Sequence, residues 1–294
     1  MNRKWVNLFA MLVLFGSIAS ACVRGPGFRP DVYLSPTGSD SNDCWSAAAA
    51  CATADHALGR LSDSGVVHFA AGGFPLTGSI NDLHGLTVLT FRGESSRTTT
   101  LYSPPGGGEV LRFTTPALVE IYNLGFDGSN TPAGTTLGSR GIVAGPGAIV
   151  RIQDCSFDGL SRGIENNGGS LYVHDSRFTN NKIGILNSNN GTAFTTIDGS
   201  RFNGNLFAIQ HDLGRMEISG TAFAGNGVPP ADELRPETVL NGGRMNISDS
   251  TFQEDAYFAI TNMKEGTLVM ALWVLAKPPP GLPVMVRVSA VRVP

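Results

Sequence analysis

The sequence predicts an all-β fold, a right-handed parallel β-helix closed by a short N-terminal helix, from three observations. The first is composition: 37 of the 294 residues are glycine, scattered through segments rich in Asn, Ser and Thr, which favours many short strands joined by tight turns. The second is a repeated segment that finishes with phenylalanine. The third is the alternation of apolar and polar residues inside each copy of that segment.

The repeated segment occurs six times, with intervals of 31, 21, 24, 21 and 29 residues between the aligned phenylalanines. The short intervals correspond to one coil, and the long ones carry insertions such as NTPAGTTLGS and GVPPADELRPET. A unit of about two dozen residues cannot close a core alone, so the copies are expected to stack with strands about 4.8 Å apart. The copies are VEIYNLGF to Phe126, VRIQDCSF to Phe157, LYVHDSRF to Phe178, TTIDGSRF to Phe202, MEISGTAF to Phe223 and MNISDSTF to Phe252.

Each copy predicts strands separated by corners, because its apolar residues alternate, skip once and alternate again. At the skip, the place of Cys155 is taken in the other copies by Leu124, Ser176, Ser200, Thr221 and Ser250. This favours an inward ladder of small side chains, in which Cys155 packs as a small hydrophobic residue and not as a nucleophile. Turn chemistry accounts for the acidic residues just before it, Asp154, Asp175 and Asp249.

A ladder of polar residues is also predicted, two residues after the isoleucine that follows the phenylalanine of a copy. Stacked asparagines at a corner can bond the backbone of adjacent coils and so satisfy groups that a turn would leave unpaired. His211 is then interpreted as a ladder member and not as a catalytic base. The aligned residues are Asn166, Asn187, His211 and Asn262.

The first 21 residues are typical of an export signal: a positively charged start, the apolar stretch LFAMLVLFGSIA and small residues before Cys22. The stretch is too short for a stable membrane span. The residues before Cys22 resemble the lipobox of bacterial lipoproteins, which implies acylation of Cys22 and a lipid anchor in the cell envelope. Ala19 replaces the usual large aliphatic residue, so cleavage after Ala21, giving a secreted or periplasmic protein, remains the alternative.

Export favours a disulfide between cysteines that are close in the sequence, because the compartment is oxidising. Cys44 and Cys51 bracket WSAAAA, and no further Cys or His stands at ligand spacing, which favours a disulfide over a metal site. No metal ion and no cofactor is therefore assigned. Cys155 is left without a partner.

The stretch CATADHALGRL has small and apolar residues at helical spacing after Thr53, a residue suited to capping a helix. Such a helix would protect the open edge of the first coil. Together with the preceding VYLSPTGSDSNDC, it resembles the entrance segment of pectin-lyase-like right-handed β-helix proteins, where a Tyr-x-Ser-x-x-Gly-Ser-Asp run precedes a short capping helix. The resemblance covers about residues 31–264.

The expected organisation follows from these signals. Residues 1–21 form the signal peptide, 22–30 a linker after the lipidated cysteine, and 31–264 the β-helix. Beyond Lys264 the repeat pattern stops, and a triple proline would interrupt a central strand. Residues 265–294 are therefore expected to be an irregular tail or the last strands.

The resemblance also raises the question of catalysis, because similar β-helix proteins include polysaccharide lyases and glycoside hydrolases. The sequence has no Asp-Asp pair, no Gly-His-Gly and no Arg-x-Lys, the signatures expected for such chemistry. No catalytic residue is assigned. A net charge of -3 argues against general binding of nucleic acid.

The best outward group of side chains is Arg177 and Arg201, which occupy the same position in adjacent coils, with His174 and Asp198 sharing a nearby corner position. These four could bind a carboxylate or sulfate. The alternative is a solvated face in which Asp198 offsets the arginines.

Two hypotheses of function follow. The first is a non-catalytic, surface-anchored protein that binds a polysaccharide or a cell-surface protein. The second is a carbohydrate-active enzyme, a polysaccharide lyase or glycoside hydrolase, with an atypical site near Arg177 and Arg201.

Overall fold

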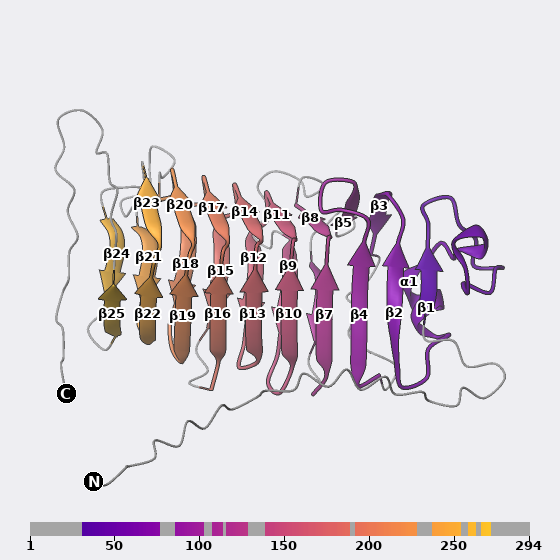
Figure 1. The fold of residues 1–294 in the computed structure, drawn as a ribbon, viewed down its shortest axis with the longest axis horizontal. Coiled ribbons are helices and arrows are strands. Elements are labelled where there is room, and N and C mark those ends of the chain that lie inside the picture. The colour runs from indigo at the N-terminus through magenta and orange to yellow at the C-terminus, as the bar shows by residue number, and fades with distance from the viewer. Residues whose placement is uncertain are drawn as a thin grey trace, which may run out of the picture.

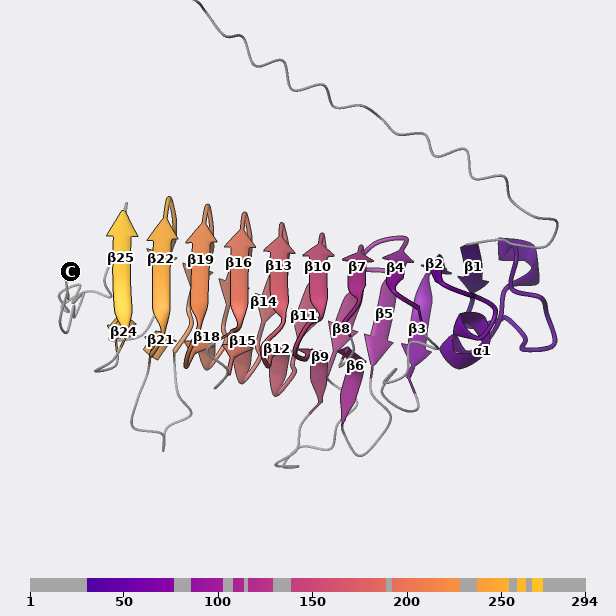
Figure 2. The same cartoon turned by 90° about the horizontal axis from the view of Figure 1, so that it is seen from below.

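A computed structural model describes residues 31–76, 86–102, 108–113, 116–128, 139–188, 192–227, 237–253, 258–262 and 266–271. In these residues the chain winds into a right-handed parallel β-helix, as the sequence predicts, and successive coils lie side by side in one row (Figures 1 and 2). The expected signal peptide, the linker and Cys22 lie outside the described residues.

Three sheets run along the helix, and the strands within each pair in parallel. Sheet A consists of β1 (Asp31–Leu34), β2 (Ser64–Phe69), β4 (Val88–Gly93), β7 (Leu118–Tyr122), β10 (Ile149–Gln153), β13 (Ser170–His174), β16 (Phe194–Asp198), β19 (Arg215–Ser219), β22 (Arg244–Ser248) and β25 (Thr267–Ala271). Sheet B consists of β3 (Gly72–Pro75), β5 (Thr99–Tyr102), β8 (Gly125–Asp127), β11 (Ser156–Asp158), β14 (Arg177–Thr179), β17 (Arg201–Asn203), β20 (Ala222–Ala224) and β23 (Thr251–Gln253). Sheet C consists of β6 (Glu109–Phe113), β9 (Arg140–Ala144), β12 (Arg162–Asn166), β15 (Ile183–Asn187), β18 (Phe207–His211), β21 (Glu237–Asn241) and β24 (Phe258–Asn262).

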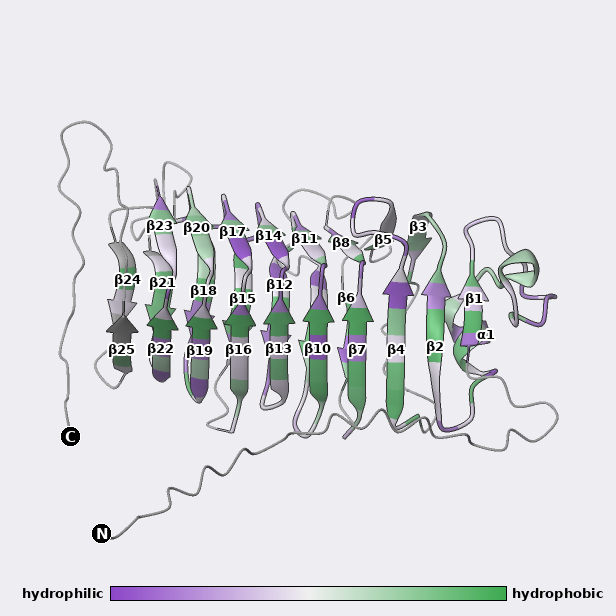
Figure 3. Ribbon diagram, in the orientation of Figure 1, coloured by the Kyte–Doolittle hydropathy of each residue, from purple (hydrophilic) through white to green (hydrophobic). Residues whose placement is uncertain are grey.

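The core is a stack of phenylalanine rings that the repeat predicts. Phe178 packs between Phe157 and Phe202, with ring centroids 4.7 Å and 4.6 Å apart and ring planes within 5° of parallel. Figure 3 shows the apolar residues of sheet A in green along β4, β7 and β10, and hydrophilic purple on β14 and β17. The stacked rings, all buried, are Phe126, Phe157, Phe178, Phe202, Phe223 and Phe252.

The corner between sheets A and B explains why aspartate, asparagine and glycine recur before the small residue. At this point the backbone has positive φ, 55° at Asp154 and 60° at Gly199. Only glycine adopts this left-handed conformation without strain, and Asn and Asp tolerate it best among the other residues. Turn chemistry therefore does select these residues, with positive φ at Asn123, Asp154, Asp175, Gly199, Gly220 and Asp249.

Cys155 packs inside the coil, as the ladder of small residues predicts. Its side chain is buried, and the Oγ of Ser176 in the next coil accepts a hydrogen bond from its backbone N–H at 3.2 Å. The same Oγ donates to the carbonyl of His174 at 2.9 Å. Burial raises the pKa of the Cys155 thiol to about 12, so it is not a thiolate at neutral pH.

Two ladders of asparagine side chains form hydrogen bonds with backbone groups of the corners on either side of sheet C. In the predicted one, Asn166, Asn187 and His211 are buried and in register, and Asn241 follows before Asn262. The second was not predicted, and its members stand three residues after a stacked phenylalanine. They are Asn181, Asn205 and Asn226, each of which donates to the backbone carbonyl of a phenylalanine.

His211 makes the first ladder sensitive to pH. Its Nδ1 accepts from the Asn187 amide at 2.9 Å and its Nε2 faces the carbonyl of Arg244 at 3.3 Å, so the ladder requires the neutral ring with the proton on Nε2. Burial lowers the pKa of His211 below 6.5, so the folded protein binds fewer protons here than the unfolded chain does. This contribution to stability is complete above about pH 6.5, the pKa in the unfolded chain, and is lost as the pH falls below that value through the lower pKa of the folded protein.

We therefore expect the free energy of unfolding to fall between about pH 7 and pH 5, by up to about 1.4 kcal/mol per pH unit from this group. Urea unfolding at both pH values measures it. The control is His211→Asn, which restores the ladder residue and keeps every other histidine, and it should show a shallower dependence on pH. Equal dependence in the two proteins would show that His211 is not the group responsible.

The N-terminal coil is closed as predicted by α1 (Ala54–Leu58), which follows a 3₁₀ turn at Ala47–Ala49. The Thr53 side chain accepts from the backbone N–H of His56 and so caps the helix. Cys44 and Cys51 form the predicted disulfide, with their Cα atoms 5.1 Å apart. No helix in the described part of the chain is long and apolar enough to cross a membrane.

Candidate functional site

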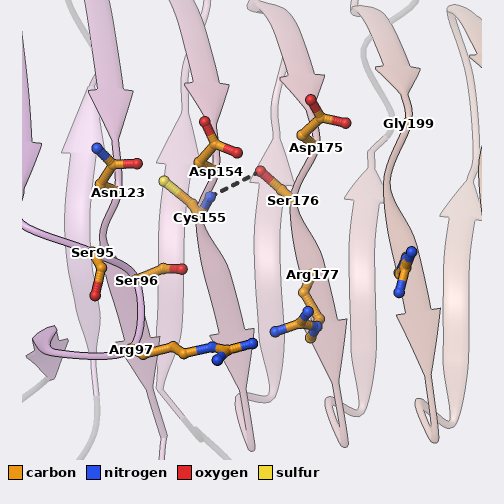
Figure 4. A pocket seen from close by; sticks show the side chains of 11 residues that line it. Ser95, Ser96, Arg97, Asn123, Asp154, Cys155, Asp175, Ser176, Arg177 and Gly199 are labelled. Atoms are coloured by element: carbon orange, nitrogen blue, oxygen red, sulfur yellow. Dashed lines mark hydrogen bonds between the residues drawn. The ribbon is translucent and has the colours of Figure 1, made fainter.

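A polar groove with a volume of about 440 Å³ lies at the corner between sheets A and B. Ser176 and Cys155 lie at its base, and charged side chains stand along it (Figure 4). The residues that line it come from β14, β17, the corners of four coils and the connection between β4 and β5. Outward side chains of neighbouring coils therefore meet here at the spacing of adjacent strands, about 4.8 Å.

The connection between β4 and β5, residues 94–98, is the unusual element of this corner, and we call it the corner loop. It has five residues, whereas the described corners from β7 to β8 and onward have two. Its Ser96 carbonyl accepts a hydrogen bond from the Ser156 hydroxyl on β11 at 2.9 Å, so the loop reaches across β8. Gly125 on β8 permits this passage, because a Cβ there would lie 2.7 Å from the Ser96 oxygen.

Three arginines form one side of the groove. Arg177 and Arg201 are in register on β14 and β17, and the corner loop adds Arg97, whose side chain extends along the groove toward Arg177 (Figure 4). All three are exposed. Within the part of the chain that the structure describes, none of their guanidinium groups lies within 4.0 Å of a carboxylate oxygen.

Polar residues of the left-handed corners form the other side, where Asn123, Asp154 and Asp175 stand in successive coils (Figure 4). The Asp154 carboxylate accepts a hydrogen bond from the Gln153 side chain at 3.2 Å. The Asp175 carboxylate lies 3.0 Å from Nε2 of His174. The groove thus places hydrogen-bond acceptors opposite cationic donors.

The structure divides the four residues that the sequence brought into one patch. Arg177 and Arg201 line the groove, but His174 and Asp198 belong to sheet A on the other side of the corner. The Nδ1 of His174 lies 3.1 Å from the Asp198 carboxylate. Asp198 therefore pairs with His174 and Ser219 and does not offset the arginines.

Sequence reasoning missed Arg97, although the run GESSRTTT has a signal of its own. The run replaces a two-residue corner by five residues, but it precedes the first of the six aligned copies. The sequence identifies Asp154 and Asp175 as corner residues, but only with a role in the turn of the backbone. Their backbone role is correct, and their carboxylates in addition line the groove.

One group of side chains in the described residues brings possible metal-ligating atoms together, Cys44, Cys51 and His56, within 4.8 Å of one another. The disulfide occupies both sulfur atoms. This grouping is therefore explained by the bridge that closes the N-terminal coil.

No family model and no curated protein matches the sequence. Solved structures do match the fold. The alginate lyase AlyGC of family PL6 matches with a TM-score of 0.57 and 10% identity over 85% of this chain and 40% of that chain. ORF18 of Geobacillus virus E2 gives a TM-score of 0.45 and 14% identity over 67% of this chain and 42% of that chain. A rhamnogalacturonan lyase gives a TM-score of 0.44 and 10% identity over 82% of this chain and 73% of that chain.

The fold is a right-handed parallel β-helix, with a polar groove at one corner. The chain spans 40% of the alginate lyase and 42% of the viral protein. At these identities the likeness concerns the fold alone.

Proposed function

We propose that the protein binds acidic polysaccharides in the groove without cleaving them. The observation that supports this is the row formed by Arg97, Arg177 and Arg201, three exposed guanidinium groups with no carboxylate partner among the described residues. Like charges held in adjacent coils repel one another, and an anionic ligand would relieve that repulsion. The guanidinium group pairs with carboxylate or sulfate through two parallel hydrogen bonds.

The opposite side of the groove supports a sugar over a simple anion. Asp154 and Asp175 can accept hydrogen bonds from hydroxyl groups, while an inorganic anion would be repelled by them. A polymer that carries both hydroxyls and acidic groups matches both sides. Because the arginines are exposed, this binding should weaken as salt screens their charges.

A second candidate, a glycoside hydrolase, rests on one observation. Asp154 and Asp175 occupy the same corner position in adjacent coils, about 4.8 Å apart along the helix, near the separation of about 5–5.5 Å used by retaining enzymes. Among the described residues, no comparable feature favours a cell-surface protein as the ligand.

Binding measurements on immobilised alginate, polygalacturonate and heparin, with neutral dextran as reference, test the proposal. The double variant Arg177→Ala/Arg201→Ala should lower the affinity for the acidic polymer by about tenfold or more, about 1.4 kcal/mol. The matched control is Arg215→Ala/Arg244→Ala, which removes two arginines that are in register on sheet A, away from the groove. It should change the affinity much less.

Two outcomes would contradict the proposal. Equal losses in both double variants would indicate a general charge effect and not binding in the groove. Release of new reducing ends from the polymer, abolished by Asp154→Asn or Asp175→Asn, would establish the hydrolase instead.

We also propose that the protein is exported and held at the cell envelope by a lipid on Cys22, with cleavage to a soluble form as the alternative. The support is the sequence of residues 1–22 alone, which lie outside the described residues. Display on the cell surface would give the groove access to polysaccharides.

A further inference from the structure

We infer that the groove recognises the end of an acidic polysaccharide chain and not its middle, an inference that rests on the proposed function. The reason is that the corner loop closes one end of the groove, while the other end is open. A polymer seated along the arginine row could then continue in one direction only. The acidic sugar unit at the chain end would lie between Arg97 and Arg177.

The closed end is built by the corner loop. Ser96 is tied to Ser156, two coils further along sheet B, so the loop lies across the position that a continuing polymer would occupy. The loop is also braced internally, with the Ser95 hydroxyl 2.8 Å from that of Thr98 and the backbone N–H of Thr99 bonded to the carbonyl of Ser95 at 2.9 Å. A loop that is fixed at both places forms a permanent wall of the groove, that is, a boundary that a bound polymer cannot cross.

The open end is built by small side chains. Beyond Arg201, the same outward position of sheet B is occupied by Ala222 on β20 and Thr251 on β23. The corner of the next coil is Gly220, which has no side chain. Each of these corners keeps two residues, so within the part of the chain that the structure describes no second corner loop obstructs the path toward the C-terminal coils.

The number of protein molecules bound per polysaccharide chain tests this inference. Fractions of the acidic polymer that binds best, from hexasaccharides to chains several times longer, are titrated with the protein in a calorimeter at known chain concentration. End recognition predicts one protein per chain at every length. Recognition of the middle predicts a number that rises with chain length, and that result would overturn the inference while leaving the proposed function intact.

The failure of the proposed function has a different signature, because then no acidic fraction of any length binds, or binding persists in Arg177→Ala/Arg201→Ala. In either case the inference falls with it. Binding of the acidic fractions with one protein molecule per polysaccharide chain at every length supports both the proposed function and end recognition.

Two variants test the role of the corner loop itself. Replacing residues 94–98 by the two-residue corner Asn-Leu, as found between β7 and β8, should open the groove and make the number bound rise with chain length. A fixed number in this variant would show that the loop is not the wall and would overturn the inference.

Should the shortened chain fail to fold, Arg97→Ala serves with the loop in place. It should lower the affinity for short and long chains by the same factor, about tenfold, since every bound chain presents its end to Arg97. Arg215→Ala is the control. A loss that is confined to short chains, because longer ones bind elsewhere along their length, would overturn the inference.

Discussion

Phe178→Ala is expected to lower the free energy of unfolding by about 3–5 kcal/mol, the usual cost of truncating a fully buried aromatic residue. Phe178 is 0% exposed and lies between two parallel rings, so its removal leaves a cavity bordered by Phe157 and Phe202. The backbone of the coil cannot collapse into that cavity without breaking the register of β14 with its neighbours. Urea unfolding followed by circular dichroism measures the loss.

The control for this prediction is the preceding residue. Arg177 points outward on the same strand, and Arg177→Ala should cost well under about 1 kcal/mol. The difference between two adjacent positions follows from the alternation of a strand. Similar unfolding midpoints for the two variants would be incompatible with the register described above.

Asn205→Ala should have a comparable effect, about 3 kcal/mol or more, through hydrogen bonds and not through packing. The Asn205 amide donates to the carbonyl of Phe178 at 3.0 Å and to Oδ1 of Asn226 at 2.9 Å. Its oxygen accepts from the backbone N–H of Asn181 at 3.0 Å and from the side chain of Asn181 at 2.9 Å. Each buried polar group left unpaired costs about 1–3 kcal/mol.

Asn203→Ala is the matched control, since Asn203 is the same residue type two positions earlier and is exposed on β17. Its replacement should change the free energy of unfolding by less than about 0.5 kcal/mol. If the two asparagine variants unfold at the same urea concentration, the second ladder does not carry the stability assigned to it.

Much of the fold could be predicted because its main determinants are local and repeated. A phenylalanine recurs at the place of Phe178 in every copy, mostly small residues at that of Cys155, and Asp, Asn or Gly at that of Asp154, so the alignment of copies shows which side chains face inward and where the chain turns. Stacking then follows from the need of each coil to bury its apolar face. The same logic gave the ladder that contains Asn187 and His211.

The groove could not be predicted in the same way, because it depends on one coil that differs from the rest. The corner loop contacts Ser156, which lies 60 residues away from Ser96 in the sequence. No periodic pattern relates the two. The division of Arg177 from His174 likewise depends on the direction in which the corner turns, which residue spacing alone does not specify.

The second asparagine ladder was missed for a simpler reason. Its members, Asn181, Asn205 and Asn226, follow the phenylalanine by three residues, but the aligned residue of the preceding coil is Leu160. The backbone N–H of Leu160 bonds to the side chain of Asn181. The ladder therefore starts two coils later than the phenylalanine stack, which begins at Phe126.

The parallel pairing of all three sheets also makes the coil the mechanical unit of this molecule. The hydrogen bonds between coils run along the helix axis, so a pull on the C-terminal end loads those of the last coil before those of any other. A coil of 21 residues, such as that from Phe157 to Phe178, would release about 70–75 Å of chain when it detaches. At the other end, the disulfide and α1 hold the first strand, so under tension the helix should peel from its C-terminal end and keep the groove until the coils of β17 and β14 are reached.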